Sequence, residues 1–125
     1  MNLSNVISGF FIILALTTNF GFFYGEPTVI AEHSRYELFA AIIFNLIATV
    51  YKLGDKTQIG AVLLATSLVA DIQLISSASV WAFGEYVVGM NTEVVVAIIS
   101  LSGGAMIANI VSVILFTAET IKSKR

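Results

Sequence analysis

A single carboxylate, Asp71, is the residue whose type and position most directly suggest chemistry. It is the only charged residue between positions 57 and 84, and Gln73 follows it two residues later. If this run crosses a membrane, the carboxylate costs roughly 2.5–3.5 kcal/mol and must gain compensating contacts. Acids at such positions usually mark an ion or proton site, and the alternative is an acid that fastens helices together.

Helical periodicity gives the segment around Asp71 two polar faces. Ser67 and Asp71 share one face, whereas Gln73 lies on a face almost opposite, together with Thr66 and Ser77. One neighbouring helix cannot satisfy both faces, because polar groups should not face lipid. We therefore expect one face to contact helices of the same chain and the other to contact another subunit or an aqueous path.

The apolar segment before this one offers a partner for the carboxylate. Asn45 lies near its middle, and its amide is expected either to donate to Asp71 or to line the same cavity. Packing between helices is an equally good explanation of Asn45, because single polar bonds in membranes average only about 0.6 kcal/mol. The predicted ion or proton site consists of Asp71, Asn45, Ser67 and Gln73.

The last apolar run carries a packing signal. Small residues recur at helical spacing, which permits close contact between helices. The predicted helix-packing or oligomer seam consists of Ser100, Gly103, Gly104, Ala108 and Asn109. The glycine pair is also compatible with a hinge or break in the helix.

Other chemistries have little support in the sequence. There is no cysteine, and the lone His33 lies among Glu32, Arg35 and Glu37, a pattern typical of an exposed, salt-bridged loop. A metal site generally needs three or four ligands, so no metal is predicted. Catalytic triads, phosphate loops and dinucleotide fingerprints are absent from the sequence, so we expect no cofactor and no enzymatic activity.

Composition indicates a membrane protein. Hydrophobic residues make up 58% of the 125 residues and charged residues 11%, with a mean hydropathy of +0.94, whereas soluble domains carry roughly 25% charged residues. The chain is therefore expected to be a single all-α domain (1–125), a polytopic helical bundle in a lipid bilayer. A net charge of −2 without a basic patch gives no indication of nucleic-acid binding.

Four transmembrane helices are predicted, at about 5–24, 34–52, 57–82 and 92–118. The second allows two interpretations, because its charge-free part, 38–51, would rise only about 21 Å as a helix. It can be re-entrant, or it can cross with Arg35 and Lys52 extending to opposite surfaces and Tyr36 and Tyr51 as boundary anchors. We favour the crossing interpretation.

Capping residues predict how the helices are joined. Gly54 and Asp55 are typical of a tight turn between the second and third helices, with Gln58 completing the cap. Asn91 or Thr92 is expected to cap the fourth helix.

Basic residues predict the orientation. They gather beside the turn between the second and third helices and at the C-terminus, so both regions are expected in the cytoplasm: Lys52, Lys56, Lys122, Lys124 and Arg125. With four spans the N-terminus is also inside and only Arg35 is on the unexpected side. With three spans no basic residue is misplaced, and the N-terminus is outside.

Two resemblances bear on function. The stretch "ELFAAIIFNLIATVYKLGDKTQIGAVLLATSLVADIQLI" resembles a family of small uncharacterised bacterial inner-membrane proteins. That resemblance implies a bacterial inner-membrane location and a link to potassium transport, and it carries no site residues. The chain is also similar in size and span number to small multidrug antiporters, whose essential acid lies in the first span, where this chain has none.

Three functions follow from these observations. The first is a small homo-oligomeric channel or transport subunit for a cation or proton, with Asp71 as the intramembrane site. The second is a non-conducting accessory subunit of a larger membrane transporter or respiratory complex. The third is a proton-coupled exporter of small cations.

Overall fold

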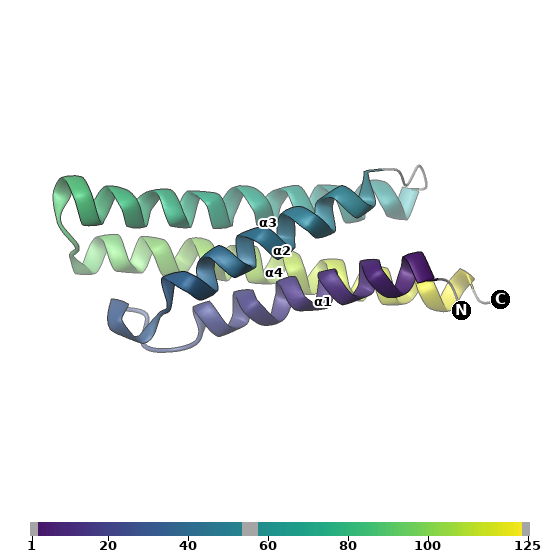
Figure 1. The fold of residues 1–125 in the computed structure, drawn as a ribbon, viewed down its shortest axis with the longest axis horizontal. Coiled ribbons are helices and arrows are strands. Elements are labelled where there is room, and N and C mark those ends of the chain that lie inside the picture. Colours follow the sequence, from purple (N-terminus) through teal and green to yellow (C-terminus); the bar gives the residue numbers. More distant parts are fainter. Residues whose placement is uncertain (1–2, 54–57, 124–125) are drawn as a thin grey trace.

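The chain folds into a bundle of long helices. The computed structural model describes residues 3–53 and 58–123, and within them the order is α1 (Leu3–Phe23), η1 (Ile30–Glu32), α2 (Arg35–Lys52), α3 (Gln58–Phe83), η2 (Gly84–Val88) and α4 (Thr92–Ser123). Successive long helices run in opposite directions (Figure 1). The expected all-α fold is therefore confirmed.

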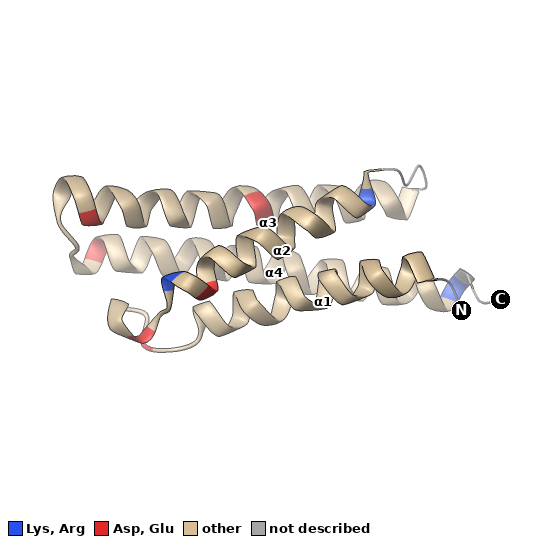
Figure 2. Cartoon of the chain, in the orientation of Figure 1, with Lys and Arg blue, Asp and Glu red and all other residues tan. Residues whose placement is uncertain are grey.

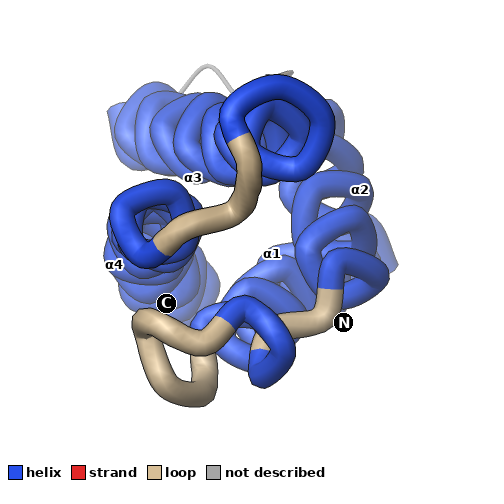
Figure 3. The backbone as a smooth tube through the Cα atoms, turned by 90° about the vertical axis from the view of Figure 1, so that its left-hand side faces the viewer, coloured by secondary structure: helices blue, strands red, loops and turns tan. Residues whose placement is uncertain are grey.

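The helices surround a common axis. The neighbouring pairs are α1 with α2, α2 with α3, α3 with α4, and α4 with α1, as the view along the bundle shows (Figure 3). Because the helices alternate in direction, the start of α1, the end of α2 and the end of α4 meet at one end of the bundle. We call this the terminal end, and Ser4, Lys52 and Thr120 line one pocket there.

Apolar side chains fill the interior and also cover the outside. Phe22, Leu38, Leu74 and Ile98 are almost fully buried in one core cluster. Large apolar side chains nevertheless remain exposed on every long helix. Such an exterior suits lipid, because soluble domains rarely expose contiguous apolar patches beyond a few hundred Å².

Within residues 3–53 and 58–123, three helical segments are long and apolar enough to cross a membrane: Leu3–Phe23, Gln58–Val88 and Thr92–Lys122. The helix α2 is not among them, although it packs along both α1 and α3. Its 18 residues include Arg35, Glu37 and Lys52. The helix expected in this region is present, and its crossing of the bilayer stays a prediction.

Local signals explain where the helices begin. The side-chain oxygen of Ser34 accepts from the backbone N–H of Glu37 at the start of α2. At the start of α4, Asn91 Oδ1 accepts from the backbone N–H of Val94 at 2.9 Å, which confirms the first of the two expected caps. The expected turn residues Gly54 and Asp55 lie outside the described residues.

The fourth helix is longer than expected and continuous. It extends to Ser123, beyond the predicted end at 118, and it passes through Gly103 and Gly104 without a break. A hinge at the glycine pair is therefore not observed.

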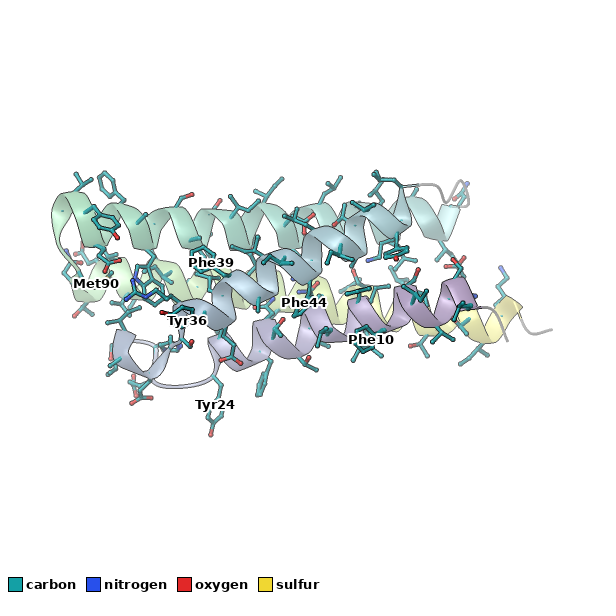
Figure 4. All side chains as sticks on the ribbon, viewed as in Figure 1. Phe10, Tyr24, Tyr36, Phe39, Phe44 and Met90 are labelled. Carbon is teal, nitrogen blue, oxygen red and sulfur yellow. The ribbon has the colours of Figure 1, made fainter. Side chains whose placement is uncertain are left out.

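Aromatic side chains lie on the outside near the end of the bundle opposite the terminal end. Tyr24 and Tyr36 project there, whereas Phe10 lies closer to the start of α1, toward the terminal end (Figure 4). Tyr24, Tyr36 and Tyr86 are all largely exposed. Rings of this kind are typical of the boundary between lipid and water.

Candidate functional site

A buried polar cluster lies between α2 and α3. Charged residues otherwise gather toward the two ends of the bundle, and Figure 2 shows one acidic position part-way along α3. Asp71 is the only charged residue of that helix. It lies about 20 Å along α3 from Gln58, because 13 residues at 1.5 Å each separate the two. Only 5% of the residue is exposed.

One carboxylate oxygen of Asp71 has a partner and the other has none. Thr49 Oγ1 lies 2.6 Å from Oδ2 of Asp71, and the same hydroxyl lies 2.8 Å from the backbone carbonyl of Asn45. Oδ1 is buried and has no hydrogen-bond partner among the described protein groups. A buried carboxylate oxygen without a partner carries a desolvation cost of about 1–3 kcal/mol or more.

Lys52 turns into the bundle instead of extending to the surface. It is 6% exposed, and its ammonium group donates to the hydroxyl of Ser67. Ser67 lies one helical turn before Asp71 on the same face of α3, so the ammonium and the carboxylate are close enough for their charges to interact. The expectation that Lys52 reaches toward water was wrong, because the nearby carboxylate and Ser67 hold it inside.

We call Thr49, Lys52, Ser67 and Asp71 the α2–α3 polar cluster. Each helix supplies two of its members, spaced three or four residues apart on one face. All four side chains are at most 8% exposed. The cluster thus combines one acid, one base and two hydroxyl groups inside an apolar bundle.

The other predicted site residues lie elsewhere. The amide of Asn45 donates to the backbone carbonyl of Ala41, one turn earlier in its own helix, at 2.7 Å. The expected donation from Asn45 to Asp71 is therefore not observed, because the amide bonds to a carbonyl of its own helix. The side chain of Gln73 packs against Gly104 of α4. Of the predicted set, only Ser67 joins Asp71 in the polar cluster.

The second polar face of α3 is satisfied within the chain. Thr66 and Ser112 share a hydrogen bond at 2.6 Å, and the hydroxyl of Ser77 donates to the backbone carbonyl of Ile98 at 2.8 Å. We expected another subunit or an aqueous path on this side. That expectation was wrong, because α4 of the same chain covers the face.

The predicted seam residues of α4 lie mostly in contacts inside the bundle. A Cβ atom at Gly103 would lie 2.8 Å from a ring carbon of Phe23 in α1, and Gly104 is covered by Gln73 of α3. Asn109 and Ala108 are buried, whereas Ser100 is exposed. Close packing inside the chain thus uses the small residues, and Ser100 alone of the five faces outward.

A third polar group joins α1 to α4. With its amide oriented to match the surrounding groups, Asn19 donates to the backbone carbonyl of Ser102 at 3.0 Å. It accepts from the N–H of Met106 at 2.9 Å and from the amide of Asn109 at 3.0 Å. We call Asn19, Ser102 and Asn109 the α1–α4 amide network. Sequence reasoning missed Asn19, for which the available signal was an amide inside the apolar run of α1, four residues before its end.

His33 fastens the loop between α1 and α2. Its ring nitrogens lie 2.6 Å from the carbonyl of Phe22 and 2.9 Å from the carbonyl of Glu26, and the residue is 5% exposed. The loop around it is exposed, as expected, but His33 itself is buried, because its ring turns inward onto the end of α1. His33 is distant in the fold from the α2–α3 polar cluster.

Two pockets open near the cluster's helices. The first, of about 260 Å³, lies at the terminal end and is lined by Ser4, Asn5, Ser8, Ile12, Tyr51, Lys52, Leu63, Phe116, Glu119 and Thr120. The second, of about 240 Å³, lies between α2 and the far end of α3, with Phe39, Trp81 and Tyr86 beside the ion pair of Arg35 and Glu85. Lys52 connects the first pocket to the cluster.

Fold and exterior define a class: in the part of the chain that the structure describes, it is an all-helical bundle with three segments long and apolar enough to cross a membrane. The chain belongs to a family of unknown function (DUF6394), whose model matches residues 32–120. The matched residues include the entire α2–α3 polar cluster and exclude all of α1. No curated protein and no solved structure matches the chain.

Proposed function

We propose that the protein is a small transport subunit of the bacterial inner membrane that handles a cation or proton at Asp71. In this proposal α2 crosses the bilayer with the three longer helices, and the terminal end faces the cytoplasm. The basic residues near that end support this orientation. Asn45 and Gln73 support neighbouring packing, and Thr49 and Lys52 take their place beside Asp71.

The observation that carries the proposal is the inward turn of Lys52. A lysine at the end of a membrane helix ordinarily extends its charged group to the interface. Here the ammonium lies inside with Ser67, one turn from a carboxylate that itself keeps one oxygen unpartnered. Ionisable pairs inside a membrane are expensive and commonly mark ion or proton pathways.

A purely structural pair is less favourable as an explanation. Replacing a buried ion pair with apolar residues of similar volume is often neutral or stabilising by about 1–4 kcal/mol. A bundle that needed only stability between α2 and α3 would gain more from leucine at these positions. The cluster is therefore better explained by a change of charge during function.

A single protomer is too slight to enclose a continuous hydrated path, because its interior around the axis is filled by the core cluster. We therefore propose that transport involves a homo-oligomer. The exposed apolar side chains of the long helices, with Ser100 among the exposed positions of α4, provide surfaces for such contacts.

Flux measurements in liposomes test the proposal. Purified protein is reconstituted, a membrane potential is imposed, and proton and potassium movements are followed separately with trapped dyes. We expect a flux that Asp71→Asn abolishes, because the amide cannot change its charge. The matched control is Glu93→Gln, which neutralises an exposed acid in the first turn of α4 and should leave the flux intact.

The alternatives predict different results. A flux that persists in Asp71→Asn removes Asp71 from the mechanism. No flux from the isolated protein, together with recovery of a larger partner in stoichiometric amount after mild detergent extraction, supports an accessory subunit instead.

The second pocket favours one further candidate, a proton-coupled exporter of small apolar cations. Its aromatic walls and the carboxylate of Glu85 suit such a cation, because cations are attracted to the faces of aromatic rings. The ion pair of Glu85 with Arg35 spans 3.5 Å and is partly exposed, so it can open at little cost. Expression in a sensitive host should then confer resistance that Asp71→Asn removes.

A further inference from the structure

The hydroxyl of Thr49 has one proton and faces two acceptors. Oδ2 of Asp71 lies 2.6 Å away and the carbonyl of Asn45 lies 2.8 Å away. A hydroxyl group donates only one hydrogen bond, although it can accept others. If Asp71 is a carboxylate, its oxygen and the carbonyl compete for that proton.

A proton on Oδ2 of Asp71 resolves this competition. The carboxylic acid then donates to Thr49, and Thr49 donates to the carbonyl of Asn45, so that each of the two contacts has its own proton. The protonated form also removes the negative charge from Oδ1, which has no hydrogen-bond partner among the described protein groups. The geometry around Thr49 therefore accommodates a neutral Asp71 without rearrangement.

Lys52 makes a bound metal ion less suitable than a proton. Its ammonium group already supplies a positive charge near the carboxylate and occupies the hydroxyl of Ser67. Hard cations require several oxygen ligands around them. A proton needs only one oxygen lone pair, so it does not require such a set of ligands.

The pocket at the terminal end gives the cluster an approach from one side. Lys52 forms part of its wall and also contacts Ser67, which lies one turn from Asp71. Polar side chains line much of this pocket, among them Ser8 and Asn5. Toward the other end of the bundle, Leu74 and Leu38 are at most 2% exposed, and no residue of the cluster lines the second pocket. Of the two pockets, the one at the terminal end is therefore the one that reaches the cluster.

We infer that the ion handled at Asp71 is the proton, and that it reaches the carboxyl group from the terminal end through the pocket beside Lys52. This inference rests on the proposed function of Asp71 as the intramembrane site. A hydronium ion in the pocket transfers its proton to a carboxylate oxygen and leaves as water. The O–H bond that forms replaces the negative charge, and Lys52 keeps its ammonium charge.

The charged and titratable groups near this path come from two helices besides α3. Lys52 and the phenol of Tyr51 belong to α2, and Glu119 belongs to α4 across the pocket. The helix α1 contributes no titratable side chain. Any dependence on pH must therefore be assigned among these groups and Asp71, which substitutions can separate.

Infrared spectroscopy tests the protonation directly. The carbonyl stretch of a carboxylic acid differs from that of a carboxylate, and the difference between wild type and Asp71→Asn isolates this one group. We expect an acid signal that appears as the pH is lowered, disappears in Asp71→Asn and is not altered by sodium or potassium. Thr49→Val should shift this signal by removing its hydrogen bond. Thr17→Val, at an exposed threonine of α1, should not.

Several outcomes overturn the inference. An acid signal missing at neutral and mildly acidic pH, or one removed by sodium or potassium at constant pH, shows that the site does not hold a proton in this way. A potassium flux abolished by Asp71→Asn together with removal of the signal by potassium keeps the proposed function and rejects the inference. An acid signal without any flux supports a proton at Asp71 and rejects the proposed transport function.

The side of access is tested with single cysteines, because the natural chain has none. Ser8→Cys places a thiol in the terminal pocket, and Ala78→Cys places one in the second pocket. A bulky, charged thiol reagent on Cys at position 8 should slow the exchange of the Asp71 acid proton for deuterium severalfold. The same reagent at position 78 should leave the exchange rate unchanged. The opposite pattern, or equal effects, rejects access from the terminal end.

Discussion

The α2–α3 polar cluster and the α1–α4 amide network are both polar contacts between neighbouring helices, yet they differ in charge. In the amide network, Asn19 satisfies a carbonyl, an N–H and a second amide with neutral groups alone. In the polar cluster, a lysine and an aspartate are buried together, and one oxygen of Asp71 has no hydrogen-bond partner among the described protein groups. The amide network thus satisfies its polar groups with hydrogen bonds, whereas the polar cluster leaves one carboxylate oxygen without a hydrogen-bond partner.

This difference assigns a packing role to the amide network and a candidate functional role to the polar cluster. Neutral polar groups that satisfy one another add modest stability and fix the register of two helices. A buried acid and base can exchange charge states, and the unmet demand of Asp71 changes when a proton arrives. The comparison predicts that substitutions in the two regions affect stability and activity in different proportions.

The largest effect is expected when one member of the charged pair is removed. Asp71→Leu leaves the ammonium group of Lys52 buried without its counter-charge, and breaking a buried pair in this way costs about 3–5 kcal/mol. Thermal unfolding in mild detergent should show the loss. Adding Lys52→Met should recover most of the stability, because the unpaired charge is then gone.

If the polar cluster serves transport and not only packing, the recovery of stability should not restore activity. The double variant Asp71→Leu/Lys52→Met should be folded and inactive in the flux assay. If the double variant is as unstable as Asp71→Leu, the two residues are not coupled. If it is stable and still transports protons, the cluster has only a structural role.

A smaller loss is expected where helices approach closely. Gly103→Ala places a Cβ atom 2.8 Å from a ring carbon of Phe23, so the ring or the helix must shift. Overpacking of this kind costs about 1–3 kcal/mol. Unfolding temperature should fall while the flux per folded molecule stays the same. Unchanged stability would show that the contact between α1 and α4 is looser than this distance implies.

The amide network should contribute less than the charged pair. Asn19→Leu removes three hydrogen bonds, and at an average near 0.6 kcal/mol each in membranes the cost is about 1–2 kcal/mol. Flux and the infrared signal of Asp71 should both be retained, because none of the hydrogen bonds found among the described residues joins the network to the cluster. Loss of transport in a folded Asn19→Leu protein would show that the two regions are not independent.

The sequence was sufficient to predict the helices and to single out Asp71 as a lone acid within one of them. Long uncharged runs predict apolar helices directly, and a lone acid in such a run is visible without a structure. Asn91 was also predictable as a cap, because its side chain acts on the helix beside it. These features depend on residues near one another in the sequence.

The partners of Asp71 were less predictable. Asn45 and Thr49 lie one turn apart on the same face of α2, so spacing alone does not say which of them meets α3. The alignment of α2 against α3 along their axes decides which residue meets Asp71, and it places Thr49 beside the carboxylate. Lys52 was assigned to the surface by the usual behaviour of lysine, which the charge of Asp71 overrides. His33 was misplaced for a similar reason, since backbone carbonyls that bind its ring are invisible in the sequence.

The smallest effect is expected at the exposed ion pair of Arg35 and Glu85. Its atoms lie 3.5 Å apart, and the side chains are 53% and 38% exposed, so solvent screens their attraction. Arg35→Gln should therefore lower stability by less than about 1 kcal/mol. Comparison with Asp71→Leu in the same unfolding assay measures what burial adds to a pair of opposite charges. A loss at Arg35 as large as the loss at Asp71 would contradict the distinction, because proximity of opposite charges alone would then account for both.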